Sequence, residues 1–146
     1  QVGWHDKKLV SGPGIVVGRK GNPGVVTWAA MDFFVIDTAF YVVPKAVCAN
    51  LYFLFHALQM HDLASLGADS AVPGLNRNLA YLSAQLVPPL PLLDRFDAHC
   101  SMLFTKSYQC VKDMHILATL RDTLLPKLIS GELRIKDAEK FMGKVV

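Results

Sequence analysis

The sequence predicts an α+β protein, in which a small mixed β-rich domain precedes a long C-terminal amphipathic helix. Short β-branched runs alternate with glycine and proline in the first third of the chain. The segment from about residue 92 to 128, by contrast, holds no glycine and no proline before Pro126. With 146 residues, of which 52% are hydrophobic, the chain allows one domain with a core of its own and is not a disordered sequence.

Two strands joined by a glycine-rich turn are predicted near the N-terminus. Apolar β-formers occupy residues 15–17 and 25–28, and the segment between them reads GRKGNPG. Such runs separated by Gly, Asn and Pro are typical of strands and turns. A further strand region is expected at residues 32–43, with a bend at Asp37 and Thr38 and an end at Pro44.

A shorter helix is predicted over residues 49–65, capped by Asn50 and stopped by Gly67. Its apolar residues recur at helical spacing and are Leu51, Leu54, Phe55 and Leu58. Residues 69–78 are expected to form a loop that leads into a short helical turn. Residues 84–87 are expected to form a strand-like piece, which the following prolines close.

The long amphipathic helix is predicted from about residue 92 to 128, with Ser130 and Gly131 as its stop. Its apolar stripe, the expected helix-pairing surface, steps by three or four residues through Val111, Met114, Leu117 (or Ala118), Leu120, Leu124 and Leu128. The stripe is not a strict heptad, and Arg121 is expected beside it. A helix of this length outruns a small domain and needs a partner helix to cover its stripe.

Charge and cysteine content narrow the class of protein. The net charge is +3 without a long basic run, and the charged fraction of 18% is low, so part of the apolar surface is expected to belong to a partner. Three cysteines, Cys48, Cys100 and Cys110, form no Cys-x-x-Cys motif, which favours free thiols in a cytoplasmic, reducing setting. Together with His99 and His115 they match no common zinc-finger spacing, so no metal or cofactor is expected.

Membrane and enzyme signatures are both missing from the pattern. The apolar runs are shorter than the about 20 residues of a membrane helix, and the N-terminal residues lack the apolar core of a signal peptide. The P-loop, the dinucleotide fingerprint, the nucleophile elbow and the zinc-protease motif do not occur. Asp32 and Asp37 are acid–base candidates by residue type only. We therefore expect a chain without catalysis of its own.

Two long stretches stand out. The first reads GIVVGRKGNPGVVTW at residues 14–28 and continues as DFFVIDTAFYV at 32–42, and the second reads LRDTLLPKLISGEL at 120–133. Two shorter strings, VPGLNRN and VPPL, lie between them at residues 72–78 and 87–90. Together, and in this order, they resemble the DNA specificity (S) subunit of type I restriction-modification enzymes. The string near the C-terminus is the more specific of the two long ones.

The resemblance implies a plan of three parts. Residues 1–91 would be the distal part of a target recognition domain, 92–130 its conserved spacer helix and 131–146 a C-terminal tail. In the family, two spacer helices pair as an antiparallel coiled coil, and each recognition domain reads one half of a bipartite DNA sequence. The implied partners are double-stranded DNA and the modification (methyltransferase) and restriction subunits. A homodimer through the long helix would replace the second repeat, which this chain lacks.

The residues suited to DNA contact lie near the glycine-lined turns. Lys, Arg and backbone amides bind phosphates, whereas Arg, Lys, Asn or Gln read base edges. The candidate DNA-binding residues are Lys7, Lys8, Arg19, Lys20, Asn22 and Arg77. Two functions stay open at this point: sequence-specific recognition, or a remnant that acts only as an assembly module by binding the modification subunit through its helix.

Overall fold

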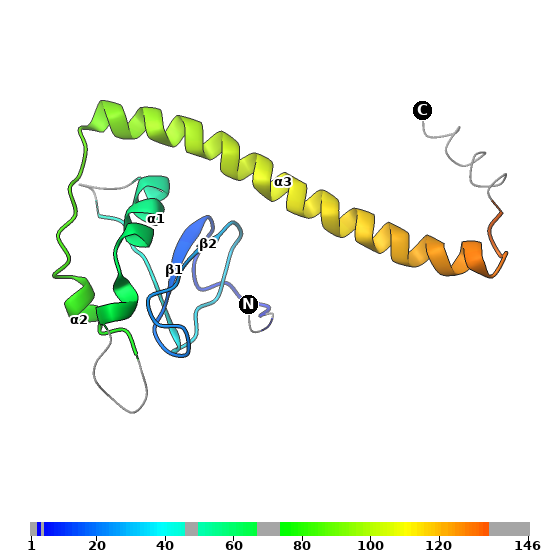
Figure 1. Ribbon diagram of the computed structural model, residues 1–146, viewed down its shortest axis with the longest axis horizontal. Helices are drawn as coiled ribbons and strands as arrows, with labels where there is room; N and C mark the ends of the chain where they lie inside the picture. Colours follow the sequence, from blue (N-terminus) through cyan, green and yellow to red (C-terminus); the bar gives the residue numbers. More distant parts are fainter. Residues whose placement is uncertain (1–2, 4, 46–49, 67–73, 135–146) are drawn as a thin grey trace. The chain divides into compact units, whose positions relative to one another are not determined.

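The computed structural model describes residues 3, 5–45, 50–66 and 74–134 of the chain. It divides into two compact units, Gln1–Met102 and Leu103–Val146. The first unit holds a small antiparallel sheet with short helices, and the second holds the larger part of α3 (Leu90–Ile129), the long C-terminal helix (Figure 1). The predicted α+β class is confirmed.

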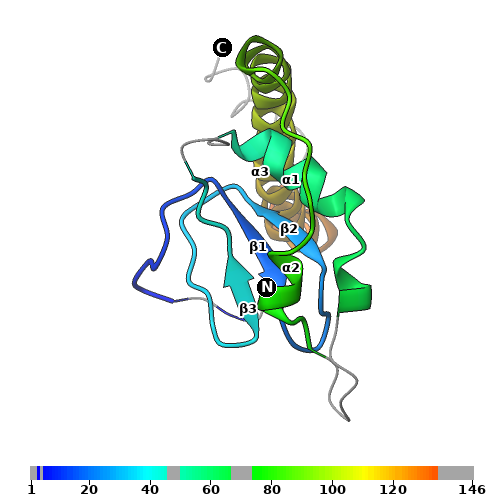
Figure 2. The ribbon, with the colours of Figure 1, turned by 90° about the vertical axis from the view of Figure 1, so that its left-hand side faces the viewer.

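The sheet is built around β1 (Gly14–Gly18), which pairs antiparallel with β2 (Val26–Ala29) on one side and with β3 (Ala39–Tyr41) on the other. The strand order is therefore β2-β1-β3 (Figure 2). Ile15 and Val17 alternate along β1 and are both buried, as expected of a central strand with one face on the core. The two predicted N-terminal strands are confirmed.

The third strand region is shorter than the sequence predicts. The turn at Asp37 and Thr38 is confirmed, but the strand itself covers only Ala39–Tyr41. Upstream, Phe33 makes an isolated bridge, in which its amide donates to the carbonyl of Val10 at 3.0 Å. The residues between Phe33 and the turn form no ladder, because β1 is already paired on both edges.

The helix α1 (Leu51–Met60) begins as predicted and ends early. Asn50 caps it, since its side-chain oxygen accepts from the amide of Phe53 at 3.2 Å. The predicted extent to residue 65 is wrong, and the predicted stop, Gly67, lies outside the described residues. The helix ends at Met60 because Asp62 starts a new turn, the 3-10 helix η2 (Leu63–Leu66), by accepting from the amide and the hydroxyl of Ser65.

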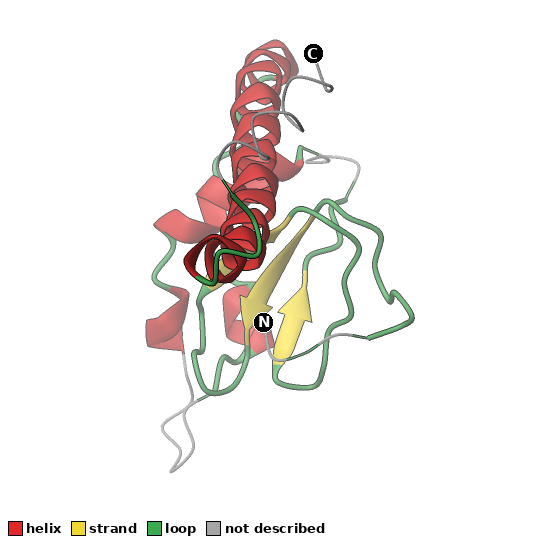
Figure 3. Cartoon of the chain, turned by 90° about the vertical axis from the view of Figure 1, so that its right-hand side faces the viewer, coloured by secondary structure: helices red, strands yellow, loops and turns green. Residues whose placement is uncertain are grey.

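The short helical turn predicted to follow the loop at residues 69–78 is α2 (Arg77–Ala80). Residues 69–73 of that loop lie outside the described part. The strand predicted at residues 84–87 is wrong. This stretch has no regular secondary structure and is drawn as a green loop in Figure 3. Its apolar side chains find no core, since Leu86 is 86% exposed, and the prolines that follow have no amide to donate to a ladder.

The first unit has a small core, to which β1, α1, η2, the segment before α2 and the start of α3 contribute. Its buried side chains are Ile15, Val17, Phe55, Leu63, Leu75, Leu93 and Cys100. Aromatic packing extends it, because Trp28 stacks on Tyr52 with ring centroids 4.9 Å apart and meets the ring of Phe55 edge-on at 5.6 Å. The first turns of α3 thus belong to the core of the first unit.

The long helix is confirmed over Leu90–Ile129. It starts where the carbonyl of Pro89 accepts from the amides of Leu92 and Leu93, and it stops at Gly131, whose φ of +75° and bond to the carbonyl of Leu128 close the last turn. No helix in the described ranges is both long and apolar enough to cross a membrane. Of the expected C-terminal tail, residues 131–134 are described and residues 135–146 lie outside the described part.

One carboxylate on α3 faces the core. The Oδ1 atom of Asp97 is buried without a hydrogen-bond partner among the described residues, and this burial raises the pKa of the carboxyl above its ordinary value of 3.8. The nearby carboxylate of Asp94 adds to the rise, while a hydrogen bond from Asn50 opposes it. Between the unfolded and the native pKa the native state binds more protons, so stability falls as pH rises through this range.

Replacing Asp97 with Asn is expected to raise the melting temperature at pH 7, because the amide carries no charge to desolvate. The gain should vanish below the ordinary aspartate pKa of 3.8, where the unfolded carboxyl is itself protonated. Thermal unfolding between pH 3 and pH 7 measures it. A D97N protein less stable than wild type at pH 7 would contradict the assignment.

Candidate nucleic-acid interface

The turn between β1 and β2 is held by its own backbone. The amide of Gly24 donates to the carbonyl of Gly18, and the amide of Gly18 donates to that of Val25, both at 2.9 Å. Gly21 and Gly24 take the positive φ angles of +78° and +79° that the path of the chain requires. The turn therefore has one defined shape, and it carries three of the six candidate residues.

A second segment is bonded to this turn. An isolated antiparallel bridge links Lys20 to Gly74, and the amide of Leu75 donates to the carbonyl of Arg19 at 2.8 Å. Asn76 then caps α2 by accepting from the amides of its first turn, so Arg77 opens that helix. Tertiary pairing thus brings Arg77 to the same end of the sheet as the turn.

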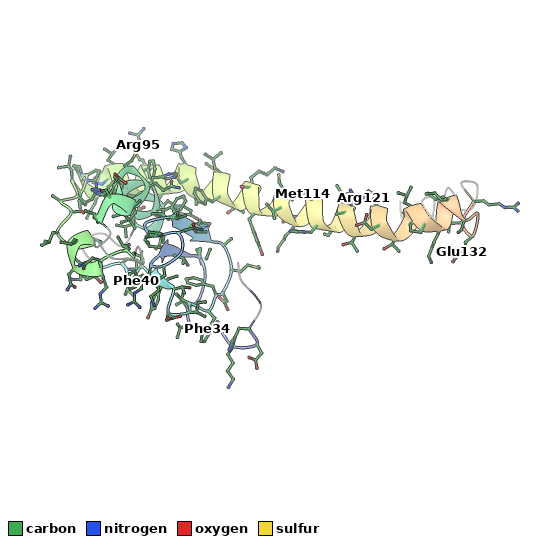
Figure 4. All side chains as sticks on the ribbon, turned by 60° about the horizontal axis from the view of Figure 1, so that its bottom comes forward. Phe34, Phe40, Arg95, Met114, Arg121 and Glu132 are labelled. Atoms are coloured by element: carbon green, nitrogen blue, oxygen red, sulfur yellow. The ribbon has the colours of Figure 1, made fainter. Side chains whose placement is uncertain are left out.

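The two cations of the turn are held by the segment before β3. The guanidinium of Arg19 donates to the backbone carbonyl of Asp37 at 3.2 Å and lies 5.6 Å from the centre of the Phe40 ring, which Figure 4 labels. The ammonium of Lys20 lies 3.7 Å from the carboxylate of Asp37. Both contacts are at the surface, where an ion pair contributes little stability, so they orient the cations without neutralising them fully.

Asn22 and Arg77 complete this group, which we call the turn cluster: Arg19, Lys20, Asn22 and Arg77. Arg77 is exposed and lies 6.0 Å from the ring of Tyr81 on the same segment. Asn22 is exposed, and no hydrogen bond of its side chain occurs within the described part of the chain. The cluster combines cations suited to phosphates with an amide suited to a base edge.

The remaining two candidates lie at the opposite end of β1. Lys8 pairs with Asp32 at 2.8 Å, and Asp32 also accepts from the amide of Gly12 at 2.9 Å. The bond from Lys8, followed by the one from Gly12, holds the pKa of Asp32 below its ordinary value. β1 separates the Lys8–Asp32 ion pair from the turn cluster by about 13 Å along the strand. The six candidates therefore form two groups, the turn cluster on one side and Lys7 with Lys8 on the other, and not one patch.

The expected helix-pairing residues lie on the part of α3 in the second unit. Of the six, all but Leu124 are exposed, and Leu124 is half-buried. A shallow groove follows this face and is lined by Cys110, Asp113, Met114, Leu117, Ala118 and Arg121. Arg121 lines this groove together with Met114 and Leu117; Met114 and Arg121 are labelled in Figure 4. Ala118 is the predicted alternative to Leu117 in the stripe, whereas Cys110 is not predicted there, because a small residue carries little weight in an apolar periodicity.

The cysteine and histidine residues on α3 show no assembled metal site. Among the described residues, no group of three His, Cys, Asp or Glu side chains is placed to hold a metal ion. Cys100 is buried in the core, and this burial raises the pKa of its thiol, which disfavours the thiolate that a metal or a nucleophilic mechanism needs. Cys110 is exposed on the groove, and Cys48 lies outside the described residues.

Comparison with known proteins gives a partial match. No protein-family model matches the chain. Over 52 residues, or 36% of its length, the chain is 40% identical to the type I restriction enzyme MjaIX specificity subunit of Methanocaldococcus jannaschii. The matched segment is 12% of the length of that relative. The chain is thus similar to a type I specificity subunit over about a third of its residues, in agreement with the resemblance read from its motifs.

Proposed function

We propose that this chain is a non-catalytic DNA-recognition module of a type I restriction-modification system. The observation that carries the proposal is the 40% identity over 52 residues to a protein named as a specificity subunit. The chain would direct partner modification (methyltransferase) and restriction subunits to one half of a bipartite target. Residues 1–91 would serve as the distal part of a target recognition domain, 92–130 as the spacer helix and 131–146 as the tail.

The turn cluster is the proposed DNA contact. Its cations come from two segments that backbone bonds hold together, so they face a duplex as one preformed surface. Lys7 and Lys8 stay candidates for a secondary contact, because they lie apart from the turn cluster and Lys8 is paired with Asp32. Phosphate contacts of this kind set affinity and register, while sequence is read at base edges.

Replacing Arg19 and Lys20 together with Ala is expected to weaken DNA binding and to lower the slope of log affinity against log salt by about 1.8, since each lost phosphate contact removes about 0.9. Fluorescence anisotropy with a labelled duplex at several salt concentrations measures both quantities. The charge-matched control is Lys7→Ala with Lys8→Ala, which should lower the slope by less. An unchanged slope in the Arg19 and Lys20 variant would contradict the assignment of the turn cluster.

The second candidate function is an assembly module that binds the modification subunit through α3 but selects no sequence. The observation that favours it is the exposed apolar face of α3 in the second unit. The two functions separate when the chain and a type I modification subunit are mixed and used to select from a randomised duplex pool. An enriched motif supports recognition. An intact complex with no enrichment, and only salt-sensitive general binding, supports assembly alone.

A further inference from the structure

The polar side chains around the β1–β2 turn differ in what they already bind. Arg19 and Lys20 both contact Asp37, and the side-chain oxygen of Asn76 accepts the hydrogen bond that caps α2. By contrast, the side-chain amide of Asn22 makes no hydrogen bond within the described part of the chain. The same holds for Asn78 on α2, which makes it a natural comparison. Asn22 therefore keeps both the donor and the acceptor of its amide for a ligand.

The backbone that carries Asn22 is fixed from both sides. A side chain at Gly18 would overlap the carbonyl oxygen of Asn22, and one at Gly24 would overlap the backbone of η2. Pro23 follows directly, which confines Asn22 to extended backbone conformations. The backbone position from which the Asn22 side chain extends is thus fixed, and little backbone conformational entropy is lost when it binds.

The tip of the turn is open to an approaching duplex. Gly21, next to Asn22, is so exposed that a Cβ built on it would meet nothing within 4 Å. The base edges of DNA are open to protein side chains in the major groove, which is about 12 Å wide. The cations of the turn cluster flank this tip, where they are suited to the phosphates on the rim of the groove.

We infer that Asn22 reads an adenine in the major groove, accepting from its N6 amino group and donating to its N7. This inference rests on the proposed DNA-recognition function and names the chemistry of that site. Asn is one of the two side chains that make this bidentate pair, whereas a phosphate needs neither its acceptor nor its geometry. Arg19 and Lys20 then supply general affinity, and Asn22 supplies discrimination at one base pair.

The test compares Asn22→Ala with the wild type and with the matched control Asn78→Ala. Each full-length chain, with the modification subunit, selects from a randomised duplex pool, and its affinity is then measured for the selected site and for copies with one base pair changed. We expect N22A to lose about 5- to 150-fold of its preference at a single A·T position. Its salt slope and melting temperature should stay unchanged, because Asn22 contacts no phosphate and has no internal partner. N78A should keep the full preference.

The other outcomes separate the two hypotheses. A wild-type chain that enriches no sequence overturns both the proposed recognition function and the role of Asn22. Enrichment by the wild type that N22A retains at every position overturns the role of Asn22 alone, as does a loss seen in N78A and not in N22A. A loss that is equal for all sequences also overturns it, since this result marks a phosphate contact and not a base contact.

Discussion

Replacing Gly24 with Ala is expected to lower the free energy of unfolding by about 3 kcal/mol. Gly24 has a φ of +79°, which costs an L-residue about 1–2 kcal/mol. In addition, its new Cβ would overlap the amide nitrogen of Ala64 and lie 2.6 Å from the carbonyl carbon of Leu63, so η2 would have to move. Overpacking of this kind typically adds about 1–3 kcal/mol. Urea denaturation followed by circular dichroism measures the loss.

Gly21 offers the matched control for this prediction. Its φ of +78° is nearly the same, but an added Cβ would meet nothing within 4 Å. Gly21→Ala should therefore show the conformational cost alone, about 1–2 kcal/mol. Equal losses in the two variants would mean that the turn does not press on η2. Because this packing fixes the turn, we also expect Gly24→Ala to weaken DNA binding more than Gly21→Ala does.

Local chemistry explains which elements could be predicted. The β-branched runs around Ile15 and Val26, the side-chain cap of Asn50 and the stop at Gly131 are determined by residues within a few positions of one another. The early end of α1 depends on the new turn at Asp62, whose bonds to Ser65 the apolar periodicity does not reveal. The strand expected at residues 84–87 has suitable residues, but this stretch pairs with neither edge strand of the described sheet, β2 or β3.

The candidate site was predictable by residue type and not by arrangement. Lys and Arg near glycine-rich turns indicate an anion-binding surface, but their grouping depends on pairings between distant segments. The bridge from Lys20 to Gly74 brings Arg77 to the turn, and the pairing of Lys8 with Asp32 places the other cations at the far end of β1. The role of Asp37 as a common partner of Arg19 and Lys20 could not be read from spacing either.

Replacing Leu117 with Asp is expected to convert a self-associated chain into a monomer. We propose that the exposed stripe of α3 pairs with the same stripe of a second copy, since an apolar helix face of this length is stable in water only when covered. Leu117 is 63% exposed in the single chain and lines the groove, so pairing would bury it. Burying an unpaired carboxylate there should weaken association by at least about 100-fold, or ~3 kcal/mol. Light scattering coupled to size exclusion measures the mass.

Ile116 provides a control that differs only in its direction on the helix. It is the neighbour of Leu117 and is equally exposed, at 64%, yet it does not line the groove. Ile116→Asp adds the same charge to the same turn of α3, so it has the same effect on helix stability and on net charge. Leu124→Asp, two turns further along the stripe, should act like Leu117→Asp. Two results would contradict the stripe as the pairing surface: both stripe variants keep the mass of the wild type, or Ile116→Asp dissociates the self-associated chain equally. In either case α3 must be covered along another face.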